Sequence, residues 1–257
     1  MTRKFWLSDR RSFMKKMAMV GIGGQAFLAS GNLRAAAVEG KVSVDGAQGW
    51  PAMAQRTLGR TGFEASRLTF GCGAALSRGR KDKLLNVALE SGVNVFDVGT
   101  GRYYNDAERN LAPFLKEHRD DIFLISKGMT AIEVGPGEPV SLEQHQQAAK
   151  NWTTLMEESL RDLEVDQIDA YYQMGANNAD LIGSEEMYGA FQKAKAAGKV
   201  KYYGFSSHEN AQALLEKAIE TGWYDVAMLA MTPGGWYDWN GKALLEGTPP
   251  MQQIQPL

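Results

Sequence analysis

Apolar and polar positions follow two different periods along most of this chain. Six short runs rich in β-branched and aromatic residues predict strands, at 66–70, 93–97, 122–127, 167–173, 200–205 and 225–231. Five longer segments repeat apolar residues every three or four positions and predict helices, at 81–91, 106–117, 142–163, 184–197 and 209–221. Because one helix signal separates each strand from the next, the pattern predicts parallel βα units.

Local signals sharpen the boundaries of these elements. Gly59 and Gly62 stand at turn spacing in 57–63 and predict a hairpin before the first long strand. Ser141 precedes the 142–163 helix and is followed by a Gln at the capping-box offset, which predicts an N-cap. The segment Gly71-Cys72-Gly73 has no third glycine of a dinucleotide-binding fingerprint and is interpreted as a turn.

Two architectures share this alternation, a doubly wound sheet and a (β/α)₈ barrel, and the pattern alone does not choose between them. No G-x-G-x-x-G opens a helix after a strand, which weakens the doubly wound alternative. The tail 233–257 shows no further strand signal. About six βα units are therefore predicted, fewer than a closed barrel needs.

Composition narrows the class of protein. With 257 residues, 44% hydrophobic and a single cysteine, the chain is a globular protein that cannot form an intrachain disulfide. Residues 1–37 carry seven basic groups and one acid, so the segment is +6 in a chain of net charge −2. The remainder is therefore acidic, which argues against a nucleic-acid partner. No metal site is expected.

The basic segment predicts export. Arg10-Arg11-Ser12-Phe13 resembles the twin-arginine motif, and the apolar stretch 17–30 is shorter than the roughly 20 residues that span a bilayer. Ala35 and Ala37 indicate cleavage after residue 37. We therefore expect a signal peptide at 1–37, a linker at 38–55, a barrel domain at 56–257, the twin-arginine machinery as partner and a periplasmic location.

Polar side chains end several of the predicted strands. Asp97 ends the second, Lys127 the third and Ser206-Ser207-His208 the fifth. In a barrel these ends form one face, where catalytic groups gather. With Tyr103 and Tyr104, which follow Asp97 closely, they place an acid, a base and a phenol on one rim.

On these residues the chain resembles the aldo/keto reductases. The motifs that carry the resemblance are short but occur in the family's order, at 58–62, 92–97, 103–108, 123–127, 160–163, 168–172 and 204–207. The resemblance implies a (β/α)₈ barrel, here incomplete, with the hairpin plugging its bottom. It also implies reduction of a small-molecule aldehyde or ketone by NADPH or NADH.

The resemblance assigns roles to individual residues. Asp97 orients Lys127, Lys127 makes a neighbouring phenol a usable acid, and the phenol protonates the developing alkoxide. Tyr103 matches the downstream motif better and is favoured as the phenol, with Tyr104 as the alternative. The resemblance also assigns contacts to the nicotinamide end of the cofactor to Gly73, Ser206 and Ser207.

The chain also departs from the family. Met174 occupies the place of a His that helps to polarise the carbonyl, and Met228 replaces a Gln. The last two strands of the family, whose loops hold the cofactor phosphates, have no counterpart in the sequence. Weak NADPH binding is therefore expected. The alternative function is a catalytically impaired barrel that acts as a binding protein or needs a partner to complete it.

Overall fold

The computed structural model describes residues 52–232, 234–238 and 243–244. The predicted signal peptide and most of the predicted linker lie outside these residues. In the described part, none of the helices is both long and apolar enough to cross a membrane.

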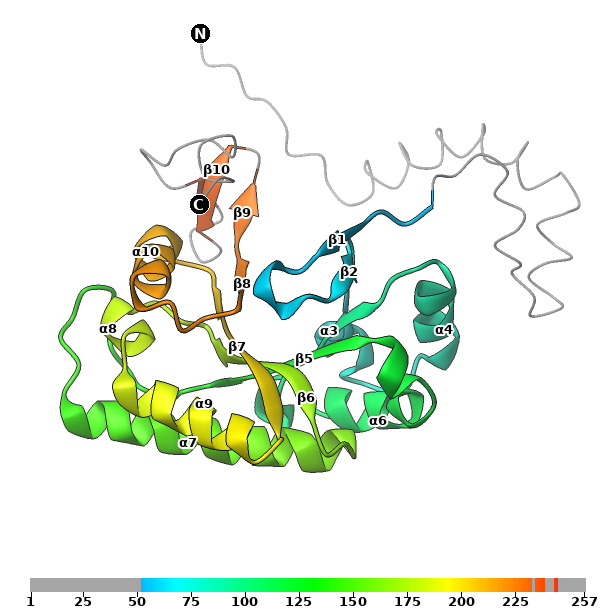
Figure 1. Ribbon diagram of the computed structural model, residues 1–257, viewed down its shortest axis with the longest axis horizontal. Coiled ribbons are helices and arrows are strands. Elements are labelled where there is room, and N and C mark those ends of the chain that lie inside the picture. The colour runs from blue at the N-terminus through cyan, green and yellow to red at the C-terminus, as the bar shows by residue number, and fades with distance from the viewer. Residues whose placement is uncertain (1–51, 233, 239–242, 245–257) are drawn as a thin grey trace, which may run out of the picture. The chain divides into compact units, whose positions relative to one another are not determined.

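Six parallel strands form one curled sheet (Figure 1). Their order is β3-β4-β5-β6-β7-β8, with bounds Thr69–Gly71, Val95–Asp97, Phe123–Met129, Ile168–Met174, Val200–Ser207 and Val226–Leu229. A doubly wound sheet reverses its strand order at a switch point, whereas here each strand pairs with its successor in the chain. The sheet is therefore of the barrel type. Within the described ranges β3 and β8 do not pair, so the (β/α)₈ fold is present but incomplete, as expected.

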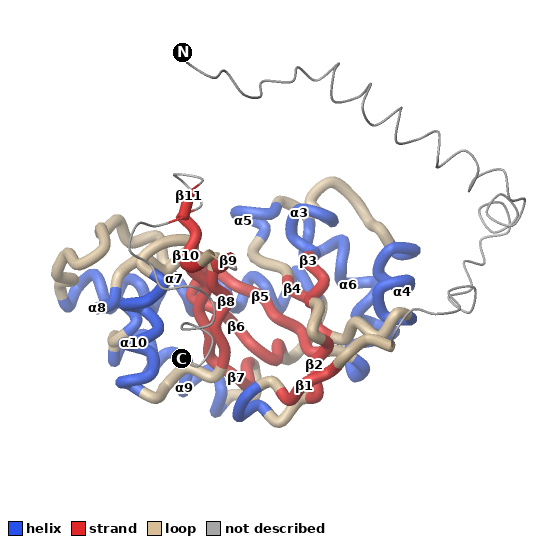
Figure 2. Tube along the Cα trace, turned by 90° about the horizontal axis from the view of Figure 1, so that it is seen from above, coloured by secondary structure: helices blue, strands red, loops and turns tan. Residues whose placement is uncertain are grey.

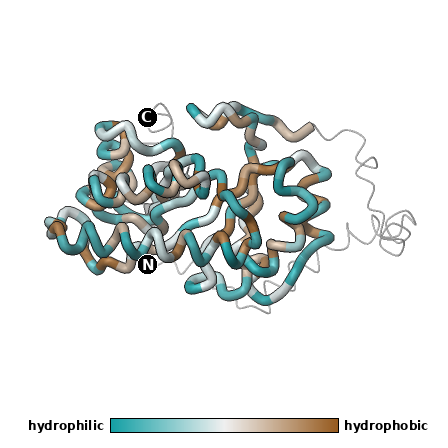
Figure 3. Tube along the Cα trace, turned by 60° about the horizontal axis from the view of Figure 1, so that its bottom comes forward, coloured by the Kyte–Doolittle hydropathy of each residue, from teal (hydrophilic) through white to brown (hydrophobic). Residues whose placement is uncertain are grey.

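Helices follow the strands and cover the outside of the arc (Figure 2). The longer ones are α4 (Asp82–Glu90), α6 (Ala107–His118), α7 (Leu142–Leu163), α9 (Glu185–Ala196) and α10 (Ala211–Thr221). Hydrophilic and hydrophobic residues alternate along them, as expected for helices with one face on a sheet (Figure 3). The predicted cap of α7 is confirmed, because Ser141 and Gln144 each bind the other's backbone amide.

Several short elements were missed or misread in the sequence. Gly71-Cys72-Gly73 was interpreted as a turn, which is wrong: Gly71 precedes a one-turn helix, α3 (Cys72–Leu76). Two further short helices, α5 (Gly101–Tyr104) and α8 (Ala179–Ile182), had no signal. After β8 the chain forms a small antiparallel sheet of β9 (Met231–Thr232), β10 (Gly235–Asp238) and β11 (Ala243–Leu244). Elements of two to five residues are too short to show a hydrophobic period.

The strands alternate their side chains between two apolar layers. The inner layer faces the axis of the arc and contains Val95, Phe123, Ile125, Ala170, Tyr172 and Val226. The outer layer packs under the helices and contains Phe96, Leu124, Trp152, Tyr171 and Tyr203. Since Lys127 follows Ile125 by two positions, the same alternation carries its side chain to the inner side at the carboxyl end of β5.

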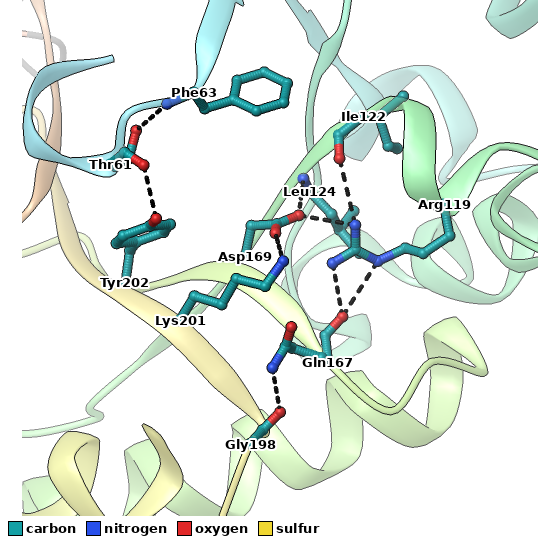
Figure 4. A network of polar contacts seen from close by, with 10 residues as sticks. All are labelled: Thr61, Phe63, Arg119, Ile122, Leu124, Gln167, Asp169, Gly198, Lys201 and Tyr202. Atoms are coloured by element: carbon teal, nitrogen blue, oxygen red, sulfur yellow. Dashed lines mark hydrogen bonds and ion pairs between the residues drawn. The ribbon is translucent and has the colours of Figure 1, made fainter. Parts of the chain in front are cut away.

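The predicted hairpin is present and meets the amino-terminal ends of the strands. It consists of β1 (Gln55–Thr57), the 3₁₀ turn Gly59–Thr61 and β2 (Glu64–Ser66). The ring of Phe63 lies 5.2 Å from that of Phe123. Tyr202 donates to the carbonyl of Thr61 at 2.8 Å (Figure 4). The hairpin thus closes the end of the sheet opposite the predicted active site.

A buried carboxylate ties together three strands at this lower end (Figure 4). Asp169 in β6 accepts from Lys201 in β7 at 2.7 Å and from the amide of Leu124 in β5 at 2.9 Å. Arg119 approaches the same carboxylate to 2.8 Å and also donates to the carbonyl of Gln167. Removing Asp169 would deprive Lys201 and Arg119 of a counter-charge and the amide of Leu124 of its acceptor. Asp169 therefore stabilises this end of the sheet.

We expect Asp169→Ala to lower the free energy of unfolding by about 3 kcal/mol, because it leaves Arg119 without its counter-charge and the buried amide of Leu124 without its acceptor. Urea denaturation measures the change. Asp166→Ala removes an exposed carboxylate from the bend just before β6 and should alter stability by less than about 0.5 kcal/mol. Equal effects of the two substitutions would contradict this role.

Candidate active site

A buried ion pair lies at the carboxyl ends of β4 and β5. Lys127 Nζ donates to Asp97 Oδ1 at 2.6 Å and also to Oδ2. Both residues are buried, with relative exposures of 4% for Lys127 and 8% for Asp97. Burial raises the pKa of Asp97, and the neighbouring lysine opposes this shift only in part. The structure therefore brings together the predicted acid and base across neighbouring strands.

Tyr104 lies in a slot beside this pair. A Cβ atom on Gly73 would come within 2.7 Å of the Tyr104 ring, and one on Gly99 within 2.9 Å of it. Lys127 Nζ lies 5.8 Å from the centre of the same ring. The amide of Thr100 donates to the carbonyl of Lys127 at 3.0 Å, which ties the turn before α5 to β5. The two glycines are thus the residues that leave room for the ring.

Burial raises the pKa of the Tyr104 phenol, and the nearby Asp97 carboxylate and Tyr103 raise it further. The resemblance implied that Lys127 would lower this pKa, but in the structure the largest effect on the phenol is burial. The phenol is consequently neutral at physiological pH. A neutral phenol is the form that can donate a proton.

Tyr103 occupies a different environment. Its side chain is 57% exposed, and its ring meets that of Tyr104 edge-on, with 4.8 Å between centroids. The sequence motif favoured Tyr103, but the geometry places Tyr104 against Lys127. A one-turn helix sends consecutive side chains in different directions, so a match to a linear motif does not determine which of the two rings turns inward.

A cavity of about 510 Å³ opens in front of these groups. Asp97, Lys127 and both tyrosines line it, together with Ser206 and Ser207 at the end of β7. The hydroxyl of Ser207 is engaged with the backbone of Glu209, whereas Ser206 Oγ accepts weakly from the amide of Gly175 at 3.4 Å. Gly73 is not part of the wall, because the Tyr104 ring lies against it.

Methionines form much of the apolar wall. Met174 and Met228, which the resemblance placed at a substrate and a cofactor position, line the cavity, and Met129 and Met231 join them. Tyr237 of β10 also lines it. Met129 could have been found by extending the alternation of β5 by one more pair, from 125 and 127 to 129. Tyr237 is one of the tail aromatics that the sequence left open between substrate wall and core. A thioether donates no hydrogen bond, so Met174 cannot supply the polarising contact of a histidine.

Within the described ranges, no cluster of three or more His, Cys, Asp or Glu side chains could hold a metal ion. Burial also raises the pKa of Cys72, the single cysteine, which lies close to Asp97 and Lys127. His208, predicted on this rim, also lines the cavity. The ionisable side chains of this site are thus the carboxylate, the ammonium, the imidazole and the phenols.

The curled parallel sheet is of the (β/α)₈ type, and the buried Asp–Lys pair, the phenol and the cavity lie at its carboxyl end, where active sites of this fold are found. A sequence profile of the aldo/keto reductase family matches residues 67–232. This chain belongs to the aldo/keto reductase family.

Known proteins similar to this chain agree with that assignment. The uncharacterized oxidoreductase YqkF of Bacillus subtilis is 27% identical over 156 residues, which are 60% of this chain and 49% of that protein. "Probable aldo-keto reductase 1" of Glycine max is 30% identical over 158 residues, 58% of this chain and 43% of that protein. The chain therefore spans about half the length of these relatives.

The structure of the aldo-keto reductase AKR11C1 from Bacillus halodurans, in its holo form, shares the fold. It superimposes with a TM-score of 0.54 and 24% identity over 71% of this chain and 60% of that one.

The stability of the protein should depend on the Lys127–Asp97 ion pair. Lys127→Met should lower the free energy of unfolding at neutral pH by about 3 kcal/mol, because Asp97 is then buried without a counter-charge. Because the pKa of Asp97 is higher in the folded than in the unfolded protein, ionisation of Asp97 lowers the free energy of unfolding as pH rises through the folded pKa. The loss should therefore shrink at acid pH, where Asp97 is protonated.

The control is the double variant Lys127→Met with Asp97→Asn, which removes both charges and should recover stability at neutral pH. Denaturant unfolding across the pH range measures all three proteins. A penalty for Lys127→Met that does not change with pH would show that the pair is not electrostatically coupled.

Proposed function

We propose that this chain is an NAD(P)H-dependent reductase that converts an aldehyde or ketone to the alcohol. The observation that carries the proposal is the placement of a neutral, half-buried phenol beside the buried Lys127–Asp97 pair, at the wall of a cavity. In this proposal the nicotinamide end of the cofactor would enter this cavity, which Ser206 lines together with the pair. When bound, the cofactor supplies a hydride, and the chain supplies orientation and the proton.

Tyr104 is the proton donor in this proposal. Its hydroxyl gives a proton to the carbonyl oxygen as negative charge develops there, which leaves a phenolate. Lys127 then stabilises the phenolate, because an ammonium group close to a phenolate lowers its energy. Asp97 holds the lysine in place through both carboxylate oxygens. Proton donation and charge stabilisation thus come from three neighbouring groups of two strands and one short helix.

Met174 is expected to lower the catalytic rate of this site. Without a histidine at this position, the strand end of β6 supplies no side-chain donor to the carbonyl oxygen, and the Tyr104 hydroxyl is the proposed donor. Removing one such donor from an active site typically costs about 10²–10³ in rate. The methionine wall also favours a substrate with an apolar body, because thioethers pack flexibly against apolar groups.

Three variants test the chemistry. Tyr104→Phe should lower kcat by about 10²–10⁴ because it removes the general acid, and Lys127→Met should have a comparable effect. Tyr103→Phe keeps the exposed ring and should stay within about tenfold of wild type. The measurement is oxidation of NADPH or NADH with 4-nitrobenzaldehyde.

Two results would overturn parts of this proposal. Loss of activity in Tyr103→Phe but not in Tyr104→Phe would exchange the roles of the tyrosines. If the wild-type chain turned over no carbonyl and quenched no cofactor fluorescence, the non-redox binding function would be favoured instead.

We also propose that residues 1–37 direct the protein to the periplasm through the twin-arginine route, on the basis of Arg10-Arg11 and the weakly apolar stretch after them. Changing both arginines to lysine keeps the charge and should leave the precursor in the cytoplasm. Fractionation followed by immunoblotting measures the distribution. Unchanged export of that variant would exclude the route.

A further inference from the structure

A second cavity of about 410 Å³ lies beside the catalytic cavity. Tyr103 and Met129 line both cavities, so these two side chains form the partition between them. Small-molecule sites in proteins have volumes of about 300–1,000 Å³. The second cavity is therefore large enough to hold part of a ligand that extends from the first. Its remaining wall comes from the turn before α5, α5 itself, the segment after β5, and α7: Thr100, Arg102, Ala131, Asn151, Thr154 and Leu155.

The partition presents apolar surface to solvent. Tyr103 and Met129 are large apolar side chains, yet both are exposed. The ring of Tyr103 also meets that of Tyr104, the proposed proton donor. Apolar groups gathered in a concave region of the surface mark a ligand site, since a ligand that covers them removes them from water. A molecule whose carbonyl lies at Tyr104 therefore finds an apolar surface that continues from the catalytic cavity into the second one.

Hydrogen bonds to α7 fix the shape of the second cavity. Arg102 of α5 donates to both carboxylate oxygens of Glu158 on α7, at 2.6 and 3.1 Å, and so ties the two helices together. Asn151 of α7 donates to the carbonyl of Thr130 at 2.7 Å. The next residue, Ala131, has a φ of 56°, a conformation that is uncommon for a residue with a Cβ atom and persists where its surroundings fix it. The segment after β5 is therefore anchored to α7 where it lines the cavity.

The chemistry of this wall favours an uncharged group. A Cβ atom on Gly128 would lie 2.8 Å from the Leu155 side chain, so a glycine in β5 lets this leucine come close to the strand. Leu155 is buried and adds apolar surface to the cavity. Arg102 is the one charged residue of the wall, and Glu158 already neutralises it. An ionised ligand group would thus lose hydration here without meeting an unpaired counter-charge.

We propose that the second cavity is a subsite that binds the distal, uncharged and apolar part of the substrate while the carbonyl lies at Tyr104. The identity of the occupant as a substrate rests on the proposed reductase function, whereas the subsite itself can be measured by binding alone. The proposal also gives Tyr103 a role other than proton donation, because its ring lies where a ligand passes from one cavity to the other.

Two straight-chain aldehydes test the subsite, because butanal and nonanal carry the same reactive group and differ only in length. Wild type should have a kcat/KM for nonanal at least about tenfold above that for butanal, since each methylene group that leaves water contributes about threefold. The gain should appear mainly as a lower KM, because contacts made equally in the ground state and the transition state do not raise kcat. Oxidation of NADPH or NADH measures both constants.

Thr154→Trp places a large ring in the second cavity, since Thr154 is exposed on α7 and lines that cavity but not the catalytic one. The kcat/KM for nonanal relative to butanal should fall by about tenfold in this variant. The matched control is Arg161→Trp, which adds the same ring to an exposed position two turns further along the same face of α7, outside both cavities. The control should keep the wild-type ratio.

Binding of 1-nonanol provides a readout that needs no turnover. In calorimetric titrations, 1-nonanol should bind wild type and Arg161→Trp about tenfold more tightly than it binds Thr154→Trp, and 1-butanol should not distinguish the three proteins. Circular dichroism checks that each variant is folded. If Thr154→Trp fails to fold, Thr154→Phe adds a smaller ring and should change both measurements in the same direction.

A nonanal preference that is unchanged in the folded Thr154→Trp variant, or that is missing in wild type, would overturn the subsite. If wild type turns over no aldehyde, the reductase function fails, but the titrations still decide the subsite. Weaker binding of 1-nonanol to Thr154→Trp alone would support a binding cavity at this position, and equal binding to all three proteins would exclude it.

Discussion

The buried ion pair between Lys127 and Asp97 is the interaction on which the rest of the site depends. Two charges can be buried only if each finds the other at hydrogen-bond distance. Parallel pairing of β4 with β5 brings the two strand ends side by side and supplies that geometry. The pair in turn constrains its surroundings, because Tyr104 reaches it only where Gly73 and Gly99 leave no side chain in the way.

The alternation of β5 separates two kinds of polar chemistry. Lys127 faces the cavity, whereas Ser126 faces the helices and binds Glu108. One strand therefore connects the proposed catalytic lysine to a buried cluster of Ser126, Glu108, Ser159 and Tyr171. The lower end of the sheet is organised differently: there Asp169 joins three strands through an arginine, a lysine and a backbone amide, far along the strands from the cavity.

Much of the architecture could be read from hydrophobic periods. The 142–163 helix was predicted with its bounds and its cap, and the six strands of the sheet were each anticipated within a few residues. The weak points were local: 225–231 was predicted as one strand, but β8 ends at Leu229 and the chain turns into β9. Residues 66–70 were likewise predicted as one strand, although Ser66 belongs to the hairpin. Such boundaries depend on which backbone groups form hydrogen bonds with the adjacent strands. The local sequence of one segment does not specify which strands will lie beside it.

The residue types at the strand ends determined the class of chemistry: a carboxylate and a phenol follow one strand, an ammonium lies on the next, and their order along the chain indicates the family. Only the tertiary structure decided which phenol meets the lysine. Tyr103 and Tyr104 are adjacent and chemically identical, so the choice depends on the direction of one short helix and on the space left by two glycines from other segments. The link between Glu108 and Ser126 was equally absent from any local pattern, because it joins residues 18 positions apart through the packing of α6 on the sheet.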